Sequence, residues 1–278
     1  MIPTERFAPS PTGRLHLGHA FSALVAFERA RAAGGRFLLR LEDLDRSRVR
    51  PEYYGAIEED LAWLGIQWET PVWRQSTRAA AYEAALEALT ARGLTYVCTC
   101  TRRDIAEAAA APQEGAAMGP DGVVYPGTCR EAGHPPGPGT AIRLNLARTL
   151  AGHHGVSYRE TGLEAGLREI SAETLIRTTG DIVLRRRDGV PAYHLAVVVD
   201  DAAQGVTHVT RGADLAEATP IHRVLQMLLG LPEPRYHHHR LIRDGDGKRL
   251  AKRHDALSLA ALREAGVSPA EIRRRVGL

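Results

Sequence analysis

The chain has 278 residues, of which 44% are hydrophobic and 25% are charged, the composition of an ordinary globular protein. This length allows one large domain, or a catalytic domain with a smaller insertion. The net charge of +3 is too small to indicate a nucleic-acid partner by itself. The sequence has neither a secretory signal nor an apolar run near the roughly 20 residues that span a bilayer, so we expect a cytoplasmic protein without a membrane partner. We also expect a monomer.

Strands and helices alternate in the first third of the chain. The expected elements are strands at 5–8 and 36–42 and helices at 17–33, 52–65 and 77–92. Two prolines and a glycine exclude a helix between 9 and 13, and Gly34-Gly35 ends the first helix. This alternation predicts an α/β fold with a parallel, doubly wound sheet.

The alternation breaks at residues 95–140, where cysteines, glycines and prolines accumulate around an alanine run. Such a composition indicates an irregular insertion. Helical patterns return at 171–179 and 219–229. Between them, residues 182–199 predict a hairpin that turns at Asp188-Gly189 and continues as a second strand over 192–199.

A Pro/Gly-rich loop, PSPTG at 9–13, joins the first strand to the first helix. The N-terminus of a helix offers backbone N–H groups and positive dipole charge, which suit a phosphate. His16 and His19 share one face of the first turn, where imidazoles can donate hydrogen bonds to a phosphate. Gly13 and Gly18 allow close approach of a ligand. An H-x-x-H pair alone is commonly accidental, but the preceding loop and strand favour a functional site.

Both lysines of the chain, Lys248 and Lys252, lie in one loop at 244–253, whereas every other basic residue is arginine. A compact ammonium on such a loop can follow phosphates from the ground state to the transition state. Taken alone, the segment is an ordinary charged surface loop. Taken with the first motif, it predicts a lysine that closes over a polyphosphate.

These two motifs resemble the signatures of class I aminoacyl-tRNA synthetases: His16-Leu17-Gly18-His19 matches the first, and RLAKR at 249–253 matches the second. Longer segments resemble glutamyl-tRNA synthetases, and they are RFAPSPTG at 6–13, LRLEDLD at 39–45, YHLA at 193–196 and VVDD at 198–201. In the second signature, Arg249 and Ala251 replace a lysine and a serine, whereas Lys252 is retained.

The chain departs from glutamyl-tRNA synthetases at Val197, where they usually carry Asn, and at Arg211–Leu215. It also ends where an anticodon-binding domain would begin. With these departures, the full length resembles the glutamyl-queuosine tRNA(Asp) synthetase family. The resemblance implies activation of L-glutamate with ATP and Mg²⁺ in the absence of tRNA, followed by transfer of glutamate to queuosine in the tRNA(Asp) anticodon.

The resemblance also implies roles for individual residues. His16, His19 and Lys252 would stabilise the reacting phosphate. The ATP site would comprise Pro11, Thr12, Gly13, His16, Gly18, His19 and Lys252. Glutamate would be bound through its ammonium by Glu42, Ser10 and the Ala8 carbonyl, and through a carboxylate by Arg6, Tyr193 and Arg211. Arginine suits the latter task because its guanidinium can hold a carboxylate bidentately.

The expected organisation is a Rossmann-like class I catalytic domain divided by a zinc-containing insertion. Its parts are a first catalytic half at 1–95, a zinc-containing, tRNA-contacting insertion at 96–180, a second catalytic half at 181–235, and a C-terminal segment with the Lys252 loop at 236–278. Three other interpretations remain open: a truncated or discriminating glutamyl-tRNA synthetase that charges a tRNA 3′ end, a nucleotidyltransferase that makes a small-molecule adenylate, and a non-catalytic tRNA-binding paralogue.

Three cysteines, Cys98, Cys100 and Cys129, lie within one short stretch of the insertion. In a reducing compartment such a cluster predicts one structural zinc, which usually takes four ligands. From spacing alone, His134 is the natural fourth ligand. The resemblance instead implies Tyr125, which we favour, and three free cysteines are the remaining alternative.

Overall fold

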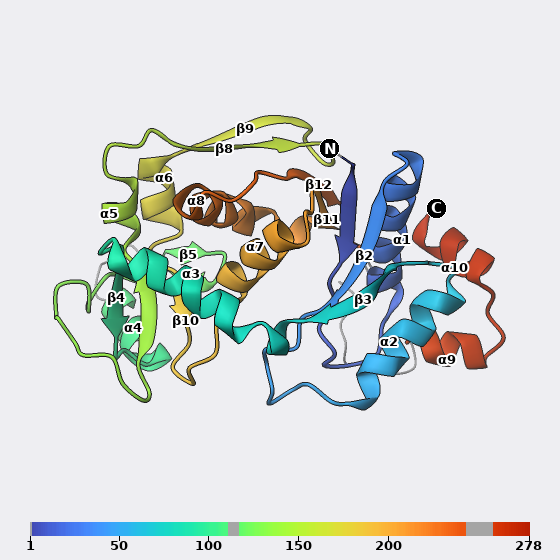
Figure 1. Ribbon diagram of the computed structural model, residues 1–278, viewed down its shortest axis with the longest axis horizontal. Coiled ribbons are helices and arrows are strands. Elements are labelled where there is room, and N and C mark those ends of the chain that lie inside the picture. The colour runs from blue at the N-terminus through green and yellow to red at the C-terminus, as the bar shows by residue number, and fades with distance from the viewer. Residues whose placement is uncertain (1, 111–116, 243–257) are drawn as a thin grey trace.

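The computed structural model describes residues 2–110, 117–242 and 258–278 and has an α/β architecture (Figure 1). The described strands are β1 (Thr4–Phe7), β2 (Arg36–Leu41), β3 (Glu69–Arg74), β4 (Thr95–Cys98), β5 (Met118–Gly119), β6 (Gly122–Val123), β7 (Ala141–Leu144), β8 (Gly155–Glu160), β9 (Gly166–Ser171), β10 (Val183–Arg185), β11 (His208–Gly212) and β12 (Arg235–His239). The described α-helices are α1 (Leu17–Ala32), α2 (Glu52–Trp63), α3 (Ala79–Ala91), α4 (Arg102–Ala110), α5 (Leu146–Leu150), α6 (Ala172–Thr178), α7 (Tyr193–Ala203), α8 (Thr219–Leu229), α9 (Leu259–Glu264) and α10 (Pro269–Val276). Within these ranges, no helix has both the length and the apolar character that a membrane crossing requires.

A parallel sheet forms the centre of the fold and confirms the α/β prediction. β2 lies between β1 and β3, and β11 pairs in parallel with β12. The two groups meet where the Thr207 N–H donates to the Thr4 carbonyl over 3.0 Å and the Thr4 N–H donates to the Thr207 hydroxyl over 2.8 Å. The chain therefore adds strands to opposite sides of β1. Open α/β sheets bind ligands at such a switch point, beyond the carboxyl ends of the strands.

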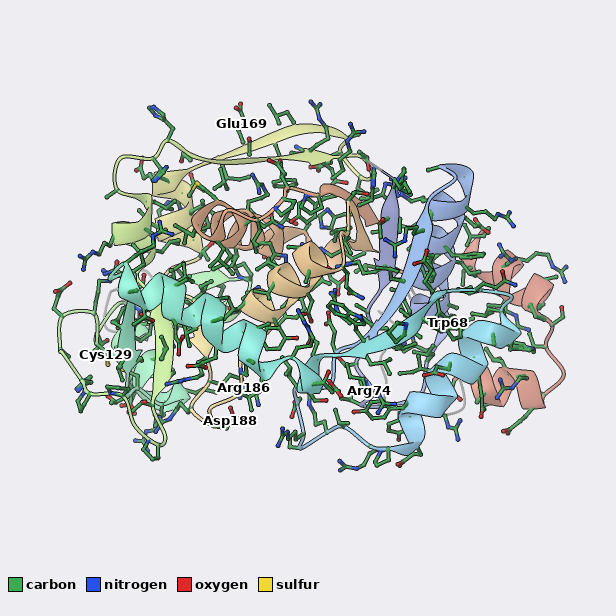
Figure 2. All side chains as sticks on the ribbon, in the orientation of Figure 1. Trp68, Arg74, Cys129, Glu169, Arg186 and Asp188 are labelled. Carbon is green, nitrogen blue, oxygen red and sulfur yellow. The ribbon has the colours of Figure 1, made fainter. Side chains whose placement is uncertain are left out.

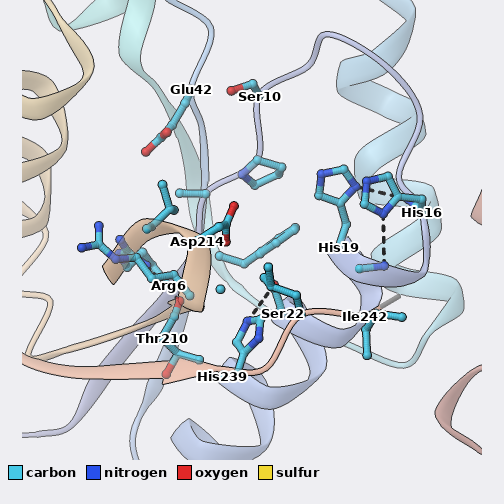
Figure 3. Close-up of a pocket in the computed structure, with 18 of the residues that line it drawn as sticks. Arg6, Ser10, His16, His19, Ser22, Glu42, Thr210, Asp214, His239 and Ile242 are labelled. Atoms are coloured by element: carbon cyan, nitrogen blue, oxygen red, sulfur yellow. Dashed lines mark hydrogen bonds between the residues drawn. The ribbon is translucent and has the colours of Figure 1, made fainter. Parts of the chain in front are cut away.

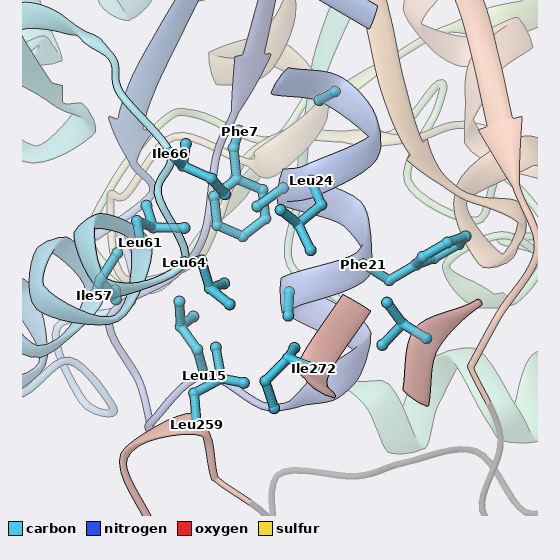
Figure 4. Packing of buried hydrophobic residues seen from close by; sticks show 14 of the residues in the cluster. Phe7, Leu15, Phe21, Leu24, Ile57, Leu61, Leu64, Ile66, Leu259 and Ile272 are labelled. Carbon is cyan, nitrogen blue, oxygen red and sulfur yellow. The ribbon is translucent and has the colours of Figure 1, made fainter. Parts of the chain in front are cut away.

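One hydrophobic core lies between α1, α2 and the C-terminal helices (Figure 4). Its buried members include Leu15, Leu24, Leu61, Leu259 and Ile272. The Leu259 N–H also donates to the Leu15 carbonyl over 2.8 Å, which ties the start of α9 to the loop before α1. The C-terminal helices thus support the loop that carries the first predicted motif.

The helices expected at 17–33, 52–65, 77–92, 171–179 and 219–229 are all present, and their ends differ from the prediction by at most two residues. These segments are amphipathic or end at glycine, and both features allow a helix to be predicted from sequence. The stretch 95–140, which was predicted to be irregular, holds the short elements β4, α4, β5 and β6. β4 pairs with β7, which pairs with β10, while β8 and β9 extend the edge of the β11–β12 sheet.

The second hairpin strand expected at 192–199 is wrong, because Tyr193–Ala203 forms helix α7. The turn itself is present: the Arg186 N–H donates to the Val190 carbonyl over 2.8 Å, and Gly189 has a φ of 80°. The valine-rich run suggested a strand by propensity. It is buried from His194 to Val198, however, and an apolar run without a period cannot be distinguished from a buried helix.

We predict that Leu259→Ala lowers the free energy of unfolding by about 2–5 kcal/mol, because it opens a cavity in the core beneath α1. Denaturant titration of the purified variant measures this loss. Leu163→Ala is the control, because Leu163 is 49% exposed and its truncation should change stability by no more than about 0.5 kcal/mol. Equal effects of the two substitutions would contradict the role assigned to Leu259.

Candidate active site

A cavity of about 720 Å³ opens beyond the carboxyl ends of the parallel strands (Figure 3). Its lining includes all the residues predicted for glutamate, namely Arg6, Ala8, Ser10, Glu42, Tyr193 and Arg211. From the predicted ATP set, His16, Gly18 and His19 also line it. Figure 3 shows Arg6 and Glu42 on one side of the cavity and the two histidines on the other. The structure therefore unites the two predicted groups in one site with two ends.

The histidine end is fixed by the first turn of α1. The Gly18 N–H donates to Nδ1 of His16 over 3.1 Å, and the His16 N–H donates to Nδ1 of His19 over 3.2 Å. The two rings stack with centroids 3.9 Å apart. Because each Nδ1 accepts a backbone proton, the neutral imidazole carries its own proton on Nε2. Both rings are thereby oriented as Nε2 donors beside a helix N-terminus, an arrangement that suits a phosphate.

The rest of the predicted ATP set is placed less directly. Pro11, Thr12 and Gly13 belong to the loop before α1 but do not line the cavity. Lys252, like Arg249 and Ala251, lies outside the described residues. The described chain on either side of this segment reaches the site. Ile242 lines the cavity, and Ser258 forms a β-bridge with His16.

The opposite end rests on a buried network of charges. Asp201 of α7 accepts hydrogen bonds from Nε of Arg6 over 3.0 Å and from Nη1 of Arg40 over 2.7 Å. Nη2 of Arg40 donates to Glu42 over 3.2 Å. Burial raises the pKa of Glu42, although Arg40 and Arg6 oppose that rise. An ammonium bound beside Glu42 would favour its ionised form.

Arg211 differs from Arg6 in its partners. Its Nη2 donates to the Thr219 hydroxyl over 2.8 Å, its Nε to Nε2 of His238 over 3.2 Å, and its Nη1 contacts Nδ1 of His222 at 3.2 Å. Among residues 2–110, 117–242 and 258–278, no carboxylate forms an ion pair with it. Arg211 is 95% buried and brings a positive charge to the cavity that no described acid pairs with directly.

Sequence reasoning assigned no role to Arg40, Asp201, His222 or His238. The sequence does contain a signal for Arg40 and Asp201. Arg40 is a charged residue inside an apolar strand, and Asp201 belongs to an acidic pair that follows an apolar run. Such charges are seldom buried unless they form an ion pair. For His238, the run of three histidines at 237–239 was the available hint. Sequence alone does not indicate which of these side chains faces Arg211.

The predicted metal residues lie close together in the structure. The sulfur atoms of Cys98, Cys100 and Cys129 all lie within 4.8 Å of one another. The Tyr125 hydroxyl oxygen lies 3.5 Å from the Cys98 sulfur and 3.4 Å from the Cys100 sulfur, and it accepts the Cys129 N–H over 2.8 Å. His134 contacts Thr99 instead, at 3.5 Å. In Figure 2, Cys129 lies at the opposite end of the molecule from Trp68, which packs against the core under α1.

Comparison with known proteins gives a consistent result. The family profile described as "tRNA synthetases class I (E and Q), catalytic domain" matches residues 4–123 and 169–278. A protein of Rhodobacter capsulatus named glutamyl-Q tRNA(Asp) synthetase is 61% identical over 98% of this chain and 99% of that relative. A protein of the same name from Nocardia farcinica is 47% identical over 96% of this chain and 81% of that relative.

A solved structure is similar as well. The glutamate-tRNA synthetase of Elizabethkingia anophelis superposes with a TM-score of 0.74 and 28% sequence identity over 91% of this chain. The match covers 53% of that enzyme, so this chain spans about half of its length.

Proposed function

Because this chain belongs to the class I tRNA synthetases (E and Q), within the group named glutamyl-Q tRNA(Asp) synthetases, we propose that it activates L-glutamate with ATP and transfers the glutamyl group to queuosine in the anticodon of tRNA(Asp). In the first step, a glutamate α-carboxylate oxygen bonds to the α-phosphorus of ATP, and pyrophosphate leaves. Transfer from the resulting adenylate to queuosine then releases AMP. The observation that carries this proposal is one cavity that joins an acid and two arginines to the paired histidines of α1.

The charge pattern of the cavity supports glutamate as the amino acid. We assign its ammonium to Glu42, with Ser10 and the Ala8 carbonyl as further acceptors. We assign a carboxylate to Arg211, with Arg6 and Tyr193 as further donors. Arg6 is already paired with Asp201 over 3.0 Å, so Arg211 supplies most of the uncompensated positive charge. Burial raises the pKa of Tyr193, which keeps its hydroxyl a neutral donor.

The histidine end supports ATP as the second substrate. We assign the Nε2 donors of His16 and His19 and the ammonium of Lys252 to the negative charge that grows on the phosphates. Pro11, Thr12, Gly13 and Gly18 shape the loop and helix start that ATP would contact, and Mg²⁺ would accompany the nucleotide. Positioning and charge neutralisation then account for catalysis, and no side chain forms a covalent intermediate.

The sulfur cluster fits one structural zinc. Four ligands around zinc, with Zn–S bonds of about 2.3 Å, place thiolates about 3.8 Å apart. The sulfurs of Cys98, Cys100 and Cys129 are already within 4.8 Å of one another, and the Tyr125 oxygen lies among them. We therefore propose Tyr125 as the fourth ligand. The metal would stabilise a segment that is too rich in glycine and proline to form a hydrophobic core of its own.

We predict glutamate-dependent exchange of pyrophosphate into ATP in the absence of RNA. Arg211→Ala should raise the KM for glutamate at least about tenfold, because it removes the charge that receives the carboxylate. Lys252→Ala should instead lower kcat about 100-fold, because it removes transition-state stabilisation. Exposed Arg103→Ala serves as the matched control and should change neither constant. Exchange that requires tRNA, or that prefers another amino acid, would contradict the assignment.

We also predict about one zinc per chain in protein purified without chelator, measured by elemental analysis. Tyr125→Phe should reduce the bound zinc, because it removes the fourth ligand while preserving the ring. His134→Ala, the matched comparison, should retain zinc. Metal loss from the His134 variant alone would reverse the choice of ligand, and metal-free wild-type protein would eliminate the site.

The acceptor is tested with labelled glutamate and two RNAs. An anticodon stem-loop that carries queuosine should be labelled, whereas full-length tRNA(Asp) from cells unable to make queuosine should not be. The reason is that the proposed acceptor is the modified base rather than the terminal adenosine. Labelling of the second RNA at its 3′ end, with an inert stem-loop, would identify a tRNA-charging enzyme instead.

A further inference from the structure

Two buried histidines hold Arg211, and the chemistry of arginine fixes their protonation. A guanidinium only donates hydrogen bonds, so each imidazole nitrogen that meets it must accept. Nε2 of His238 is such an acceptor, and so is Nδ1 of His222. Neither ring can be an imidazolium in this arrangement, because an imidazolium would point an N–H at the guanidinium.

The His238 ring is anchored from behind by a carboxylate. Because its Nε2 accepts, its proton lies on Nδ1 and is donated to Glu160 over 2.5 Å. The other Glu160 oxygen accepts backbone N–H groups from Thr161 at 3.1 Å, Gly162 at 2.7 Å and His238 at 3.0 Å. These hydrogen bonds outweigh the effect of burial and lower the pKa of Glu160. The carboxylate therefore orients the imidazole without touching Arg211.

The His222 ring is anchored in the same sense through a longer relay. Because its Nδ1 accepts, its Nε2 donates to Nδ1 of His194 over 3.1 Å. Nε2 of His194 then donates to the Asp121 carboxylate at 3.0 Å. Each hydrogen bond in the relay runs from Arg211 towards Asp121. Here two imidazoles, those of His222 and His194, separate the acid from the guanidinium.

The surroundings favour the neutral form of both rings. His222 and His238 are each 98% buried. Burial lowers the pKa of both, and the positive charge of Arg211 lowers each further. Their acceptor role thus agrees with their environment as well as with their geometry.

We propose that His222 and His238 are positioning residues for substrate selectivity, which orient Arg211 through neutral acceptors and so reserve its charge for an anionic substrate side chain. This inference rests on the proposed function, in which Arg211 receives a carboxylate of glutamate. A protein carboxylate in place of either ring would orient the guanidinium equally well. It would also neutralise Arg211 and remove its preference for glutamate over glutamine.

The test replaces His222 with Asn and with Asp. Either side chain can accept the Arg211 hydrogen bond at the Nδ1 position, and the two differ chiefly in charge. Neither Asn nor Asp reaches the position of Nε2, so both variants lose the hydrogen bond that His222 donates to His194. In ATP–pyrophosphate exchange, we expect His222→Asp to have a KM for glutamate at least about tenfold above that of His222→Asn. The KM for ATP should agree between the two variants, and so should the weak activity with glutamine.

Exposed His153, on the loop before β8, provides the control pair, and His153→Asn and His153→Asp should not differ. Thermal melting verifies that each variant folds. If His222→Asp does not fold, His238→Gln and His238→Glu make the same comparison at the other ring. Equal KM values for glutamate within a folded pair would overturn the inference. Wild-type protein that does not activate glutamate would instead overturn the proposed function, so the two failures are distinguishable.

Discussion

The buried carboxylate of Asp201 is the contact on which the site depends. It binds Arg6 from β1 and Arg40 from β2, two arginines that would repel one another without it. Asp201 belongs to α7, and it lies 195 positions after Arg6 and 161 positions after Arg40, so this cluster joins the first two strands to a helix much later in the chain. Removal of one partner from a buried ion pair typically costs about 3–5 kcal/mol, because the remaining charge is left unpaired. The cluster also positions Glu42 through Arg40.

The two arginines of the cavity are held by different chemistry, and this gives them different tasks. Arg6 is paired directly with an acid, so it can donate hydrogen bonds but adds little net charge. Arg211 is oriented by Thr219, His222 and His238, none of which is a carboxylate. One arginine therefore stabilises the architecture of the site, and the other supplies attraction for an anion.

The sequence predicted the fold and the cavity lining well where the signal was local. Prolines and glycines predicted the loop before α1, and helical spacing predicted that the two histidines share a face of the first turn of α1. The residues predicted to bind glutamate, which line the cavity, came from segments that resemble a known family. α7 was misassigned because Ala196–Val199 is apolar without a period, and a strand and a buried helix then have the same signature. The acceptors around Arg211 could not be predicted, because Thr219, His222 and His238 meet it only through tertiary packing.

The meeting of β1 and β11 has a consequence for how the protein is made. Thr4 and Thr207 are separated by 203 positions, so β1 leaves the ribosome long before its neighbour exists. At about 5–20 residues per second, that interval is roughly 10–40 s. During this time β2 can cover one edge of β1 while the other edge keeps its unpaired backbone groups, which invite pairing with foreign strands. The nascent chain therefore exposes this edge of β1 until translation has supplied β11.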